Sequence, residues 1–449
     1  MQKDFIARHA GPAPRYTSYP TAPHFHPAID SDTYARWLGS LKTGQTLSLY
    51  IHIPYCDRLC WFCACHTKQT LRYQPLATYL EALRREIATV ATLVDPGCRV
   101  TALHFGGGSP TLLRPDDLIA LMAFLRSHFT FNPTAEISVE MDPNDLDAAR
   151  YDALAEIGMS RASIGVQDFD PRVQKAINRE QTFEQTRGVV EEVRARGVRS
   201  VNCDVLYGLP FQTRASVERT VDQIISLSPD RIALFGYAHV PWMKTHQKMI
   251  DETALPDITE RYEQMSQAAA RLTGAGYTAI GIDHFALPGD SLAIAAASGR
   301  MRRNFQGYTT DAADALIGLG ASSIGQLPQG YVQNVTPTGE YQRIVNSGRL
   351  AAARGFELGR DDRIRARIIE LLMCDFAFAF ADLRREFGSD ADPVINEARS
   401  IAETDCEGMI ELAGGLFQVT QKGRPFVRSI AAAFDAYLAR GNARHSLSV

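Results

Sequence analysis

The chain has 449 residues, 45% of them hydrophobic and 22% charged, which is an ordinary composition for a globular protein of about two domains. Its net charge of −4 comes from interspersed acidic and basic residues, so no basic block indicates nucleic-acid binding or a membrane surface. The N-terminus lacks the apolar core of a secretory signal, and the apolar runs are too short to span a bilayer. A soluble cytoplasmic protein is therefore expected.

The first 45 residues are rich in Pro, Tyr and His and show little periodicity, so we interpret residues 1–45 as an arm laid on the body of the protein. After this arm, strand and helix patterns alternate. We expect strands at 47–53, 101–105, 136–140, 161–167, 201–208, 231–237 and 277–283, with helices between most of them, including 76–90, 118–129 and 182–196. The alternation predicts an α/β fold with a parallel sheet of right-handed βαβ units, which suits a full or partial barrel over residues 46–357.

The character of the sequence changes after about residue 358. Helical patterns cover 363–377, 381–387 and 393–402, a hairpin is expected around Gly414-Gly415, and a last helix is expected at 424–438. Residues 358–449 thus form a small, mostly helical predicted domain that resembles a winged helix. Winged helices often bind DNA, but this domain is not strikingly basic, and we predict no nucleic-acid partner.

Four of the eight cysteines, Cys56, Cys60, Cys63 and Cys65, fall within ten residues directly after the first predicted strand. Active sites of α/β folds lie at this carboxyl end of the sheet. Three thiolates spaced by four and three residues can hold a four-iron cluster and leave one iron open. A zinc ion bound by these cysteines, with Cys65 or His66 as the fourth ligand, is the alternative. The cysteine spacing favours an iron–sulfur cluster, and a zinc site stays the alternative.

Glycines and polar residues follow the next strands. Gly106–Gly108 and Ser109 come after the second strand, and glycine lets a backbone approach a ligand closely. Glu140, Gln167 and Asp204 lie at or near the ends of three later strands. A glycine triplet alone equally fits a tight turn, and one polar strand end is usually a cap. Several such residues on successive strands would all face one crevice.

The cysteine spacing, with an aromatic residue before the last cysteine, resembles the signature of the radical S-adenosylmethionine (SAM) superfamily. Other segments extend the resemblance to one family: PRYTSYPTA, CAC, GVQDFDPRVQKAINREQ, DVLYGLPFQT, FGYAHVP, DHFA and RRNFQGYTT. Together they are similar to the oxygen-independent coproporphyrinogen III oxidases, also called coproporphyrinogen dehydrogenases. Related heme-trafficking proteins lack the RYTSYP segment and typically the extra cysteine.

This resemblance implies a radical SAM barrel whose 4Fe-4S cluster is bound by Cys56, Cys60 and Cys63, with Cys65 dispensable. It also implies two bound SAM molecules. The positions that match the first are Tyr50, Gly107, Glu140 and Ile324, and those that match the second are Phe62, Gly108, Ser109, Gln167, Arg179, Asp204 and Ala238. Ser109 replaces the threonine of better-known members, which keeps the hydroxyl and loses a methyl group. We count the three cluster cysteines and Glu140 as catalytic.

The implied reaction is oxidative decarboxylation of the ring A and B propionates of coproporphyrinogen III to vinyl groups. It yields protoporphyrinogen IX in anaerobic heme biosynthesis, and a 5′-deoxyadenosyl radical from SAM removes the hydrogen. An external electron donor, such as a flavodoxin or ferredoxin system, and a monomeric enzyme are also implied. The alternatives are a heme-binding or heme-delivery protein without decarboxylase activity and a metal-dependent transcription regulator.

The substrate carries four carboxylates, which arginine forks recognise well. Arg15, Arg302 and Arg303 are candidates from their motif context. Because residues 1–45 have too little apolar periodicity to form a domain, we expect them to matter little for stability. The RYTSYP segment has amphipathic groups suited to a large flat anion, so we expect the arm to cover the active site.

Overall fold

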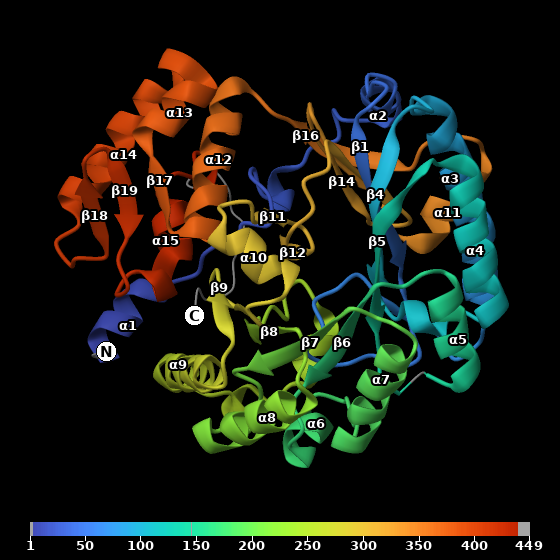
Figure 1. Cartoon of the computed structure of the whole chain (residues 1–449), viewed down its shortest axis with the longest axis horizontal. Helices are drawn as coiled ribbons and strands as arrows, with labels where there is room; N and C mark the ends of the chain where they lie inside the picture. The colour runs from blue at the N-terminus through green and yellow to red at the C-terminus, as the bar shows by residue number, and fades with distance from the viewer. Residues whose placement is uncertain (1–2, 145, 439–449) are drawn as a thin grey trace.

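The computed structural model describes residues 3–144 and 146–438. Its centre is a twelve-stranded sheet in the order β16-β15-β14-β13-β1-β4-β5-β6-β7-β8-β10-β9. Seven neighbouring strands are parallel: β13 (Ala315–Leu319), β1 (Thr46–Ile53), β4 (Arg99–Gly107), β5 (Phe131–Met141), β6 (Arg161–Gln167), β7 (Ser200–Tyr207) and β8 (Arg231–Gly236). This open, curved sheet confirms the predicted parallel α/β architecture in its partial-barrel form (Figure 1).

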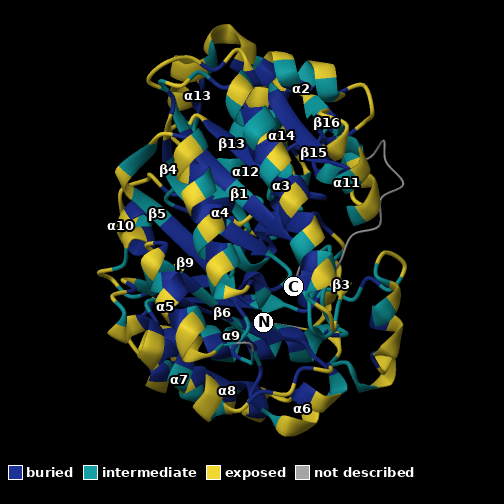
Figure 2. Cartoon of the chain, turned by 90° about the vertical axis from the view of Figure 1, so that its right-hand side faces the viewer, coloured by how far each residue is buried: buried dark blue, intermediate teal, exposed yellow. Residues whose placement is uncertain are grey.

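Helices connect the parallel strands and follow the outer face of the sheet (Figure 1). They are α3 (Gln74–Leu93), α4 (Pro115–His128), α5 (Ala148–Glu156), α6 (Pro171–Ala176), α7 (Phe183–Ala195), α8 (Arg214–Leu227) and α9 (Ile258–Gly274). Each exposes one stripe and buries another, as Figure 2 shows. On α3 the buried stripe includes Leu76, Leu80, Leu83 and Ile87, at helical spacing. The predicted helix at 182–196 is confirmed, and Thr182 caps it in a capping box with Gln185.

The predicted strand at 277–283 is wrong. Residues in this stretch form β9 (Thr278–Ile280), and a turn at Gly281 leads into β10 (His284–Ala286). Gly281 has a φ of +55°, and a Cβ there would lie 2.1 Å from the ring of Tyr308. β10 runs antiparallel to both β8 and β9, so the chain reverses here instead of adding a parallel strand. Periodicity cannot distinguish one strand from two short ones around a glycine.

The seventh parallel strand is β13, which the sequence analysis missed. It begins an antiparallel extension of the sheet made of β14 (Ile324–Leu327), β15 (Gly330–Asn334) and β16 (Ala352–Glu357). All five residues of β13 are buried, so the strand has no alternation to reveal it. Small elements complete this region: α10 (Ser291–Ala297), β11 (Arg302–Asn304), β12 (Gly307–Thr309) and α11 (Thr338–Asn346).

The C-terminal region packs three helices with a three-stranded antiparallel sheet. The helices are α12 (Arg360–Asp375), α13 (Phe380–Phe387) and α14 (Asp392–Thr404), and the sheet contains β17 (Ala377–Ala379), β18 (Ile410–Ala413) and β19 (Leu416–Val419). This arrangement has the elements of the predicted winged helix. The predicted helix at 424–438 is too long: a 3₁₀ turn at Arg424–Phe426 precedes α15 (Val427–Ala432). Residues 439–449 of the predicted domain lie outside the described residues.

The N-terminal arm contains α1 (Lys3–His9) and α2 (Ser31–Leu38) and is integral to the core. Phe5 and Ile6 pack with Phe426, and Tyr16 and Tyr19 are buried in the hydrophobic core of the C-terminal domain. The expectation that the arm matters little for stability is therefore wrong, because each large buried side chain contributes about 1.5–3 kcal/mol.

None of the helices within the described ranges is both long and apolar enough to cross a membrane.

A buried carboxylate on α3 holds the strand extension against the barrel. Glu86, 2% exposed, accepts hydrogen bonds from the Gly320 amide at 2.7 Å, the Tyr341 hydroxyl at 2.6 Å and the Asn334 amide group at 2.6 Å. Burial raises the pKa of Glu86 to about 7, although the three donors oppose this shift. Two turns earlier on α3, the Tyr79 hydroxyl donates to the carbonyl of His52 at 2.8 Å, near the carboxyl end of β1.

We predict that Glu86→Ala lowers the free energy of unfolding by roughly 3 kcal/mol or more, because it leaves three buried donors without their acceptor. Thermal or urea unfolding of the purified protein measures the effect. Glu81→Ala, at an exposed position of the same helix, is the matched control and should change stability by less than about 0.5 kcal/mol. Equal effects of the two substitutions would contradict the assigned role of Glu86.

Candidate active site

The cysteine loop begins where β1 ends and is tied to the next strand by main-chain hydrogen bonds. Its first residues form the short strand β2 (Tyr55–Cys56), which pairs with β3 (Lys68–Gln69) at the far end of the loop. The amide of Gly108 donates to the Ile53 carbonyl, and the amide of Ser109 donates to the Tyr55 carbonyl, both at 2.8 Å. The loop is thus anchored at both ends on the carboxyl edge of the sheet.

The glycine triplet is required by close packing inside the protein itself. A Cβ on Gly108 would lie 2.4 Å from the Tyr55 carbonyl oxygen, and a Cβ on Gly106 would lie 2.7 Å from a carboxylate oxygen of Glu140. Gly107 has a φ of +108°, a conformation that favours glycine, and a Cβ there would meet the ring of His52. Larger residues would push the cysteine loop and Glu140 away from the strand end.

The three predicted cluster cysteines are free thiols, and the charge on each affects the others. Burial raises the pKa of Cys56, and the neighbouring charges of Cys63 and Cys60 raise it further. Cys60 is 8% exposed, and its sulfur accepts a hydrogen bond from Arg179 Nη1 at 3.6 Å. Since a thiolate binds metal, a guanidinium beside Cys60 helps to hold its sulfur in the ligating form.

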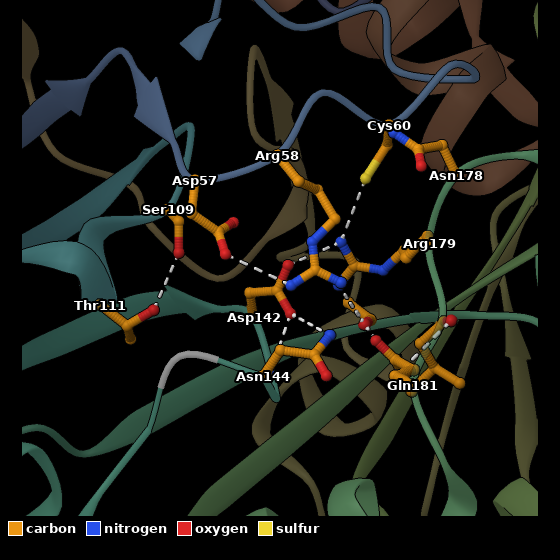
Figure 3. A network of polar contacts seen from close by, with 12 residues as sticks. Asp57, Arg58, Cys60, Ser109, Thr111, Asp142, Asn144, Asn178, Arg179 and Gln181 are labelled. Carbon is orange, nitrogen blue, oxygen red and sulfur yellow. Dashed lines mark hydrogen bonds and ion pairs between the residues drawn. The ribbon is translucent and has the colours of Figure 1, made fainter. Parts of the chain in front are cut away.

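Arg179 is the centre of the polar network around this loop (Figure 3). Its guanidinium forms an ion pair with Asp142 at 2.9 Å and donates to the Gly165 carbonyl at 2.6 Å. Asn144 donates to the same Asp142 carboxylate through its amide and its side chain, both at 3.1 Å. Arg58 and Cys60 of the loop both point toward this network. Arg179, in the segment between α6 and α7, therefore positions Cys60, and Asp142 after β5 and the Gly165 carbonyl of β6 hold Arg179.

Cys63 and Cys65 differ in their surroundings. The Cys65 amide donates to the Cys63 sulfur at 3.4 Å, and hydrogen bonding from Cys65 lowers the pKa of Cys63 to about 7 despite burial. These contacts favour Cys63 as the thiolate and Cys65 as its donor. Two side chains from the loop after β8 hold this turn: His246 bonds the Cys63 carbonyl at 2.7 Å, and Lys244 donates to the Cys65 carbonyl at 2.9 Å.

Glu140 projects from the end of β5 into the interior of the barrel. One carboxylate oxygen bonds His104 Nε2 at 3.1 Å, and the other accepts the Gly107 amide at 3.0 Å. Burial alone would raise the pKa of Glu140, but these two partners lower it, so the carboxylate stays ionised. The ring of Tyr50 stacks on His104 with 5.7 Å between centroids. Tyr50 and Gly107 are thus linked to Glu140, through His104 and through the Gly107 amide. That these three residues bind one SAM molecule stays a prediction.

A second group of predicted residues gathers along β6 and β7. A Cβ on Gly165 would lie 2.9 Å from Arg179 and 3.2 Å from the Gln167 amide nitrogen, so these two side chains converge over one glycine. Gln167 has a φ of +71°, a strained conformation that is frequent at binding sites. Asp204 is opposite Gly165 in the register, and its pKa is raised by burial and by the nearby Glu140 charge.

The residues present fit the groups that the predicted site requires. Glu140 and Asp204 line a cavity of about 190 Å³ together with Glu136 and Asp311, and these carboxylates suit the cationic parts of SAM. Arg179 Nε is buried without a hydrogen-bond partner among the described residues, and an added ligand could satisfy it. No three His, Cys, Asp or Glu side chains in the described ranges are placed to bind one metal ion. In a four-iron cluster, each cysteine bonds a different iron.

Three of the remaining predicted residues make their contacts through the backbone: Phe62, Ala238 and Ile324. Gln247 is fully buried, and its side-chain amide donates to the carbonyls of both Phe62 at 2.8 Å and Ala238 at 3.1 Å. Ile324 lies against Gly318, which pairs with Tyr50 in the sheet. The Ser109 hydroxyl bonds the Thr111 hydroxyl at 2.9 Å. The structure thus brings all the predicted residues to the carboxyl edge of the sheet, while their individual roles remain predictions.

Sequence reasoning missed several residues that position the site. Two had a recognisable signal: His104 stands two residues before the first glycine of the triplet, and Asp142 stands two residues after Glu140. His52 packs beneath Gly107, yet it looked like an ordinary strand residue. His246 and Gln247 are in a short 3₁₀ helix, Thr245–Met249, and contact the cysteine loop about 180 residues upstream in the chain. No sequence pattern could have revealed that contact.

Comparisons with known proteins agree with this site. The family model described as "Radical SAM superfamily" matches residues 50–224, which include the cysteine loop and the strands that carry Glu140, Gln167 and Asp204. The model described as "HemN C-terminal domain" matches residues 358–426. Together with the anchored cysteine loop, these matches define the class: the chain is a radical SAM protein with an added C-terminal domain.

Proteins similar to this chain identify its family within the radical SAM class. An oxygen-independent coproporphyrinogen III oxidase from Bradyrhizobium diazoefficiens is 48% identical over 97% of both chains, and one from Pseudomonas aeruginosa is 43% identical over 97% of this chain and 95% of its own. The solved structure of coproporphyrinogen III oxidase (HemN) from Escherichia coli, described as a radical SAM enzyme, has a TM-score of 0.90 at 38% identity and covers 94% of this chain and 98% of its own. This chain belongs to the oxygen-independent coproporphyrinogen III oxidase family.

We predict that anaerobically reconstituted protein contains about four irons per chain. Cys63→Ser should abolish cluster assembly, because it removes one of three ligands, whereas Cys65→Ser should retain it. Iron and sulfide analysis with absorption spectroscopy measures both, and Cys406→Ser, an exposed thiol in the C-terminal domain, is the control. Loss of the cluster in Cys65→Ser but not in Cys63→Ser, or stoichiometric zinc in iron-replete protein, would refute the ligand assignment.

We predict that Glu140→Gln and Asp204→Asn fold and keep their cluster but bind SAM about tenfold more weakly or worse, because each loses a charged hydrogen-bond partner. Equilibrium dialysis with SAM measures this affinity. Asp222→Asn, on the outer helix α8 and paired with Arg271, is the control and should bind normally. Normal SAM affinity combined with a large fall in melting temperature would mean that the two carboxylates are structural.

Proposed function

We propose that this protein decarboxylates the ring A and B propionates of coproporphyrinogen III and releases protoporphyrinogen IX. The observation that carries the proposal is the similarity to named oxidases over 97% of the chain, which includes the arm and the C-terminal domain. The anchored cysteine loop beside two interior carboxylates agrees with it. In each reaction, a propionate loses one hydrogen atom from its β carbon, carbon dioxide and one further electron, and a vinyl group remains.

The residues of the chain would bind and orient the reactants and exclude water. Cys56, Cys60 and Cys63 would hold the cluster, Tyr50 and Glu140 would bind SAM, and the Arg179–Asp142 pair would hold the Cys60 side of the loop. When bound, the cluster and SAM supply an electron and a 5′-deoxyadenosyl radical for hydrogen removal. Correct positioning within an enclosed site accounts for much of the protein's contribution to the rate.

Two SAM molecules per chain are part of the proposal. Glu140 of the first group is on β5, and Gln167 and Asp204 of the second group are on the next strands, β6 and β7, so each group could contact a separate molecule. Electrons must come from outside the chain, and a flavodoxin or ferredoxin system suits this need. We propose a monomeric enzyme, as the family resemblance implies.

The N-terminal arm would shield the opening of the barrel. Arg15 reaches the carboxyl end of β8, where its guanidinium donates to the Gly236 carbonyl at 2.9 Å. Arg303 in turn donates to the carbonyls of Arg15 and Tyr16, at 3.1 and 3.2 Å. These contacts support the proposed location of the arm beside the active site. Because Tyr16 and Tyr19 are core residues of the C-terminal domain, we propose a fixed cover rather than a loose lid.

We predict that reconstituted protein, given SAM, a low-potential reductant and coproporphyrinogen III without oxygen, forms protoporphyrinogen IX together with 5′-deoxyadenosine. Chromatography of the oxidised porphyrins and of the nucleoside measures both products. Cys56→Ser is the matched control and should form neither product. Tight heme binding without any vinyl product would support the heme-delivery alternative and would refute the proposed function.

A further inference from the structure

A cavity of about 350 Å³ lies between the barrel and the C-terminal domain, beside the region just described. Five arginines line it: Arg15, Arg261, Arg303, Arg424 and Arg428. We call it the arginine cavity. Apolar side chains, including Leu234, Phe285 and Phe376, form much of its remaining wall. Cationic groups combined with an apolar wall are typical of a site for an organic anion.

Positive charge in this cavity greatly exceeds negative charge. Asp283 is the one acidic side chain among the described residues that line it, and its carboxylate bonds His284 at 2.7 Å. Burial, together with repulsion from Arg15 and Arg303, lowers the pKa of Arg428 to about 9. Such a cluster of like charges is costly in the absence of an anion. A bound carboxylate would remove much of that cost.

The guanidinium groups are held in place by main-chain oxygens. Arg428 donates to the carbonyls of Pro14 and Ala13, and Arg261 donates to the carbonyl of Tyr237 at 3.0 Å. These carbonyls fix the positions of the two guanidinium groups in the cavity wall. Arg303 Nη1 is buried with no hydrogen-bond partner among the described residues. A ligand oxygen in the cavity could satisfy this donor.

The arginine cavity adjoins the interior cavity that contains Glu140 and Asp204. His284 lines both cavities, so they share part of a wall. Arg15 reaches from this cavity to the Gly236 carbonyl at the carboxyl end of β8, the same edge of the sheet as the cysteine loop. A molecule bound between the arginine cavity and the barrel interior could therefore place one edge near the cysteine loop and the opposite edge against the arginines.

Arg302, the third arginine suggested by the sequence, does not line this cavity. Its guanidinium is paired with the Glu370 carboxylate at 3.2 Å. The two neighbouring arginines of β11 thus differ in their charged surroundings. Arg302 is paired with a carboxylate, whereas Arg303 faces a cavity rich in positive charge. The pair offers a closely matched comparison.

We propose that the arginine cavity binds the propionate carboxylates that the substrate keeps, those of rings C and D. This assignment rests on the proposed function and extends it. The cavity is too small for a whole tetrapyrrole and suits one edge of it. A carboxylate held by guanidinium groups also resists conversion to neutral carbon dioxide, so the arginines belong with the retained propionates rather than with the reacting ones.

The test is a fluorescence titration of reconstituted holoenzyme with coproporphyrin III, the stable oxidised form of the substrate. Arg303→Gln should weaken binding about tenfold to a hundredfold, because it removes a charge-assisted contact. Arg303→Lys should recover part of the affinity, and Arg302→Gln should bind like the wild type. Protoporphyrin IX, which has only the ring C and D propionates, should lose affinity in Arg303→Gln by the same factor.

Three results would overturn the assignment: no binding of coproporphyrin III to the wild type, equal losses in Arg302→Gln and Arg303→Gln, or a loss confined to coproporphyrin III. If Arg303→Gln fails to fold, Arg15→Gln provides the same test, because Arg15 is solvent-accessible and makes its contact on the cavity wall. The cluster spectrum and melting temperature should be unchanged in each folded variant. Arginine-dependent binding without vinyl product would leave this site standing and refute only the proposed decarboxylation.

Discussion

The site depends on the two main-chain hydrogen bonds that join the start of the cysteine loop to the glycine triplet. They require the backbones of β2 and the residues after β4 to be so close that a Cβ on Gly108 would lie 2.4 Å from the Tyr55 carbonyl. This contact fixes Cys56 at the carboxyl edge of the sheet. The same glycines leave room for Glu140 and His52, so one packing constraint positions both the thiols and the interior carboxylate.

Charge is distributed in two zones around this anchor. The barrel interior has the carboxylates Glu140 and Asp204, while the cavity toward the C-terminal domain has five arginines. A single ligand with cationic and anionic parts does not explain this separation, whereas a cationic cofactor beside a polyanionic substrate does. The Arg179–Asp142 pair lies outside both zones and serves the cysteine loop itself. Placing opposite charges in separate, partly buried sites lets each select its own ligand.

The C-terminal domain and the arm pack against each other beside the barrel. Arginines from both parts of the chain meet at the arginine cavity, and Tyr16 and Tyr19 join the arm to the C-terminal core. A domain that looks like a DNA-binding module in sequence instead supplies Phe376, Arg424 and Arg428 to a cavity wall. The winged-helix elements therefore serve here to close one side of the barrel.

The sequence by itself determined the parallel strands from residue 46 to residue 237 and the helices at 76–90, 118–129 and 182–196, because alternating periodicities are local. It also identified the clustered cysteines, because they lie within one loop, and their role as cluster ligands stays a prediction. Only the tertiary structure decided which distant side chains serve that loop. His246 and Gln247 contact it from a short 3₁₀ helix, and β13, with all five residues buried, gives no alternating pattern. Arg302 and Arg303 are adjacent in sequence, yet only Arg303 faces the arginine cavity. Burial and charge pairing are properties of the folded chain, since they depend on residues that come into contact only when the chain folds.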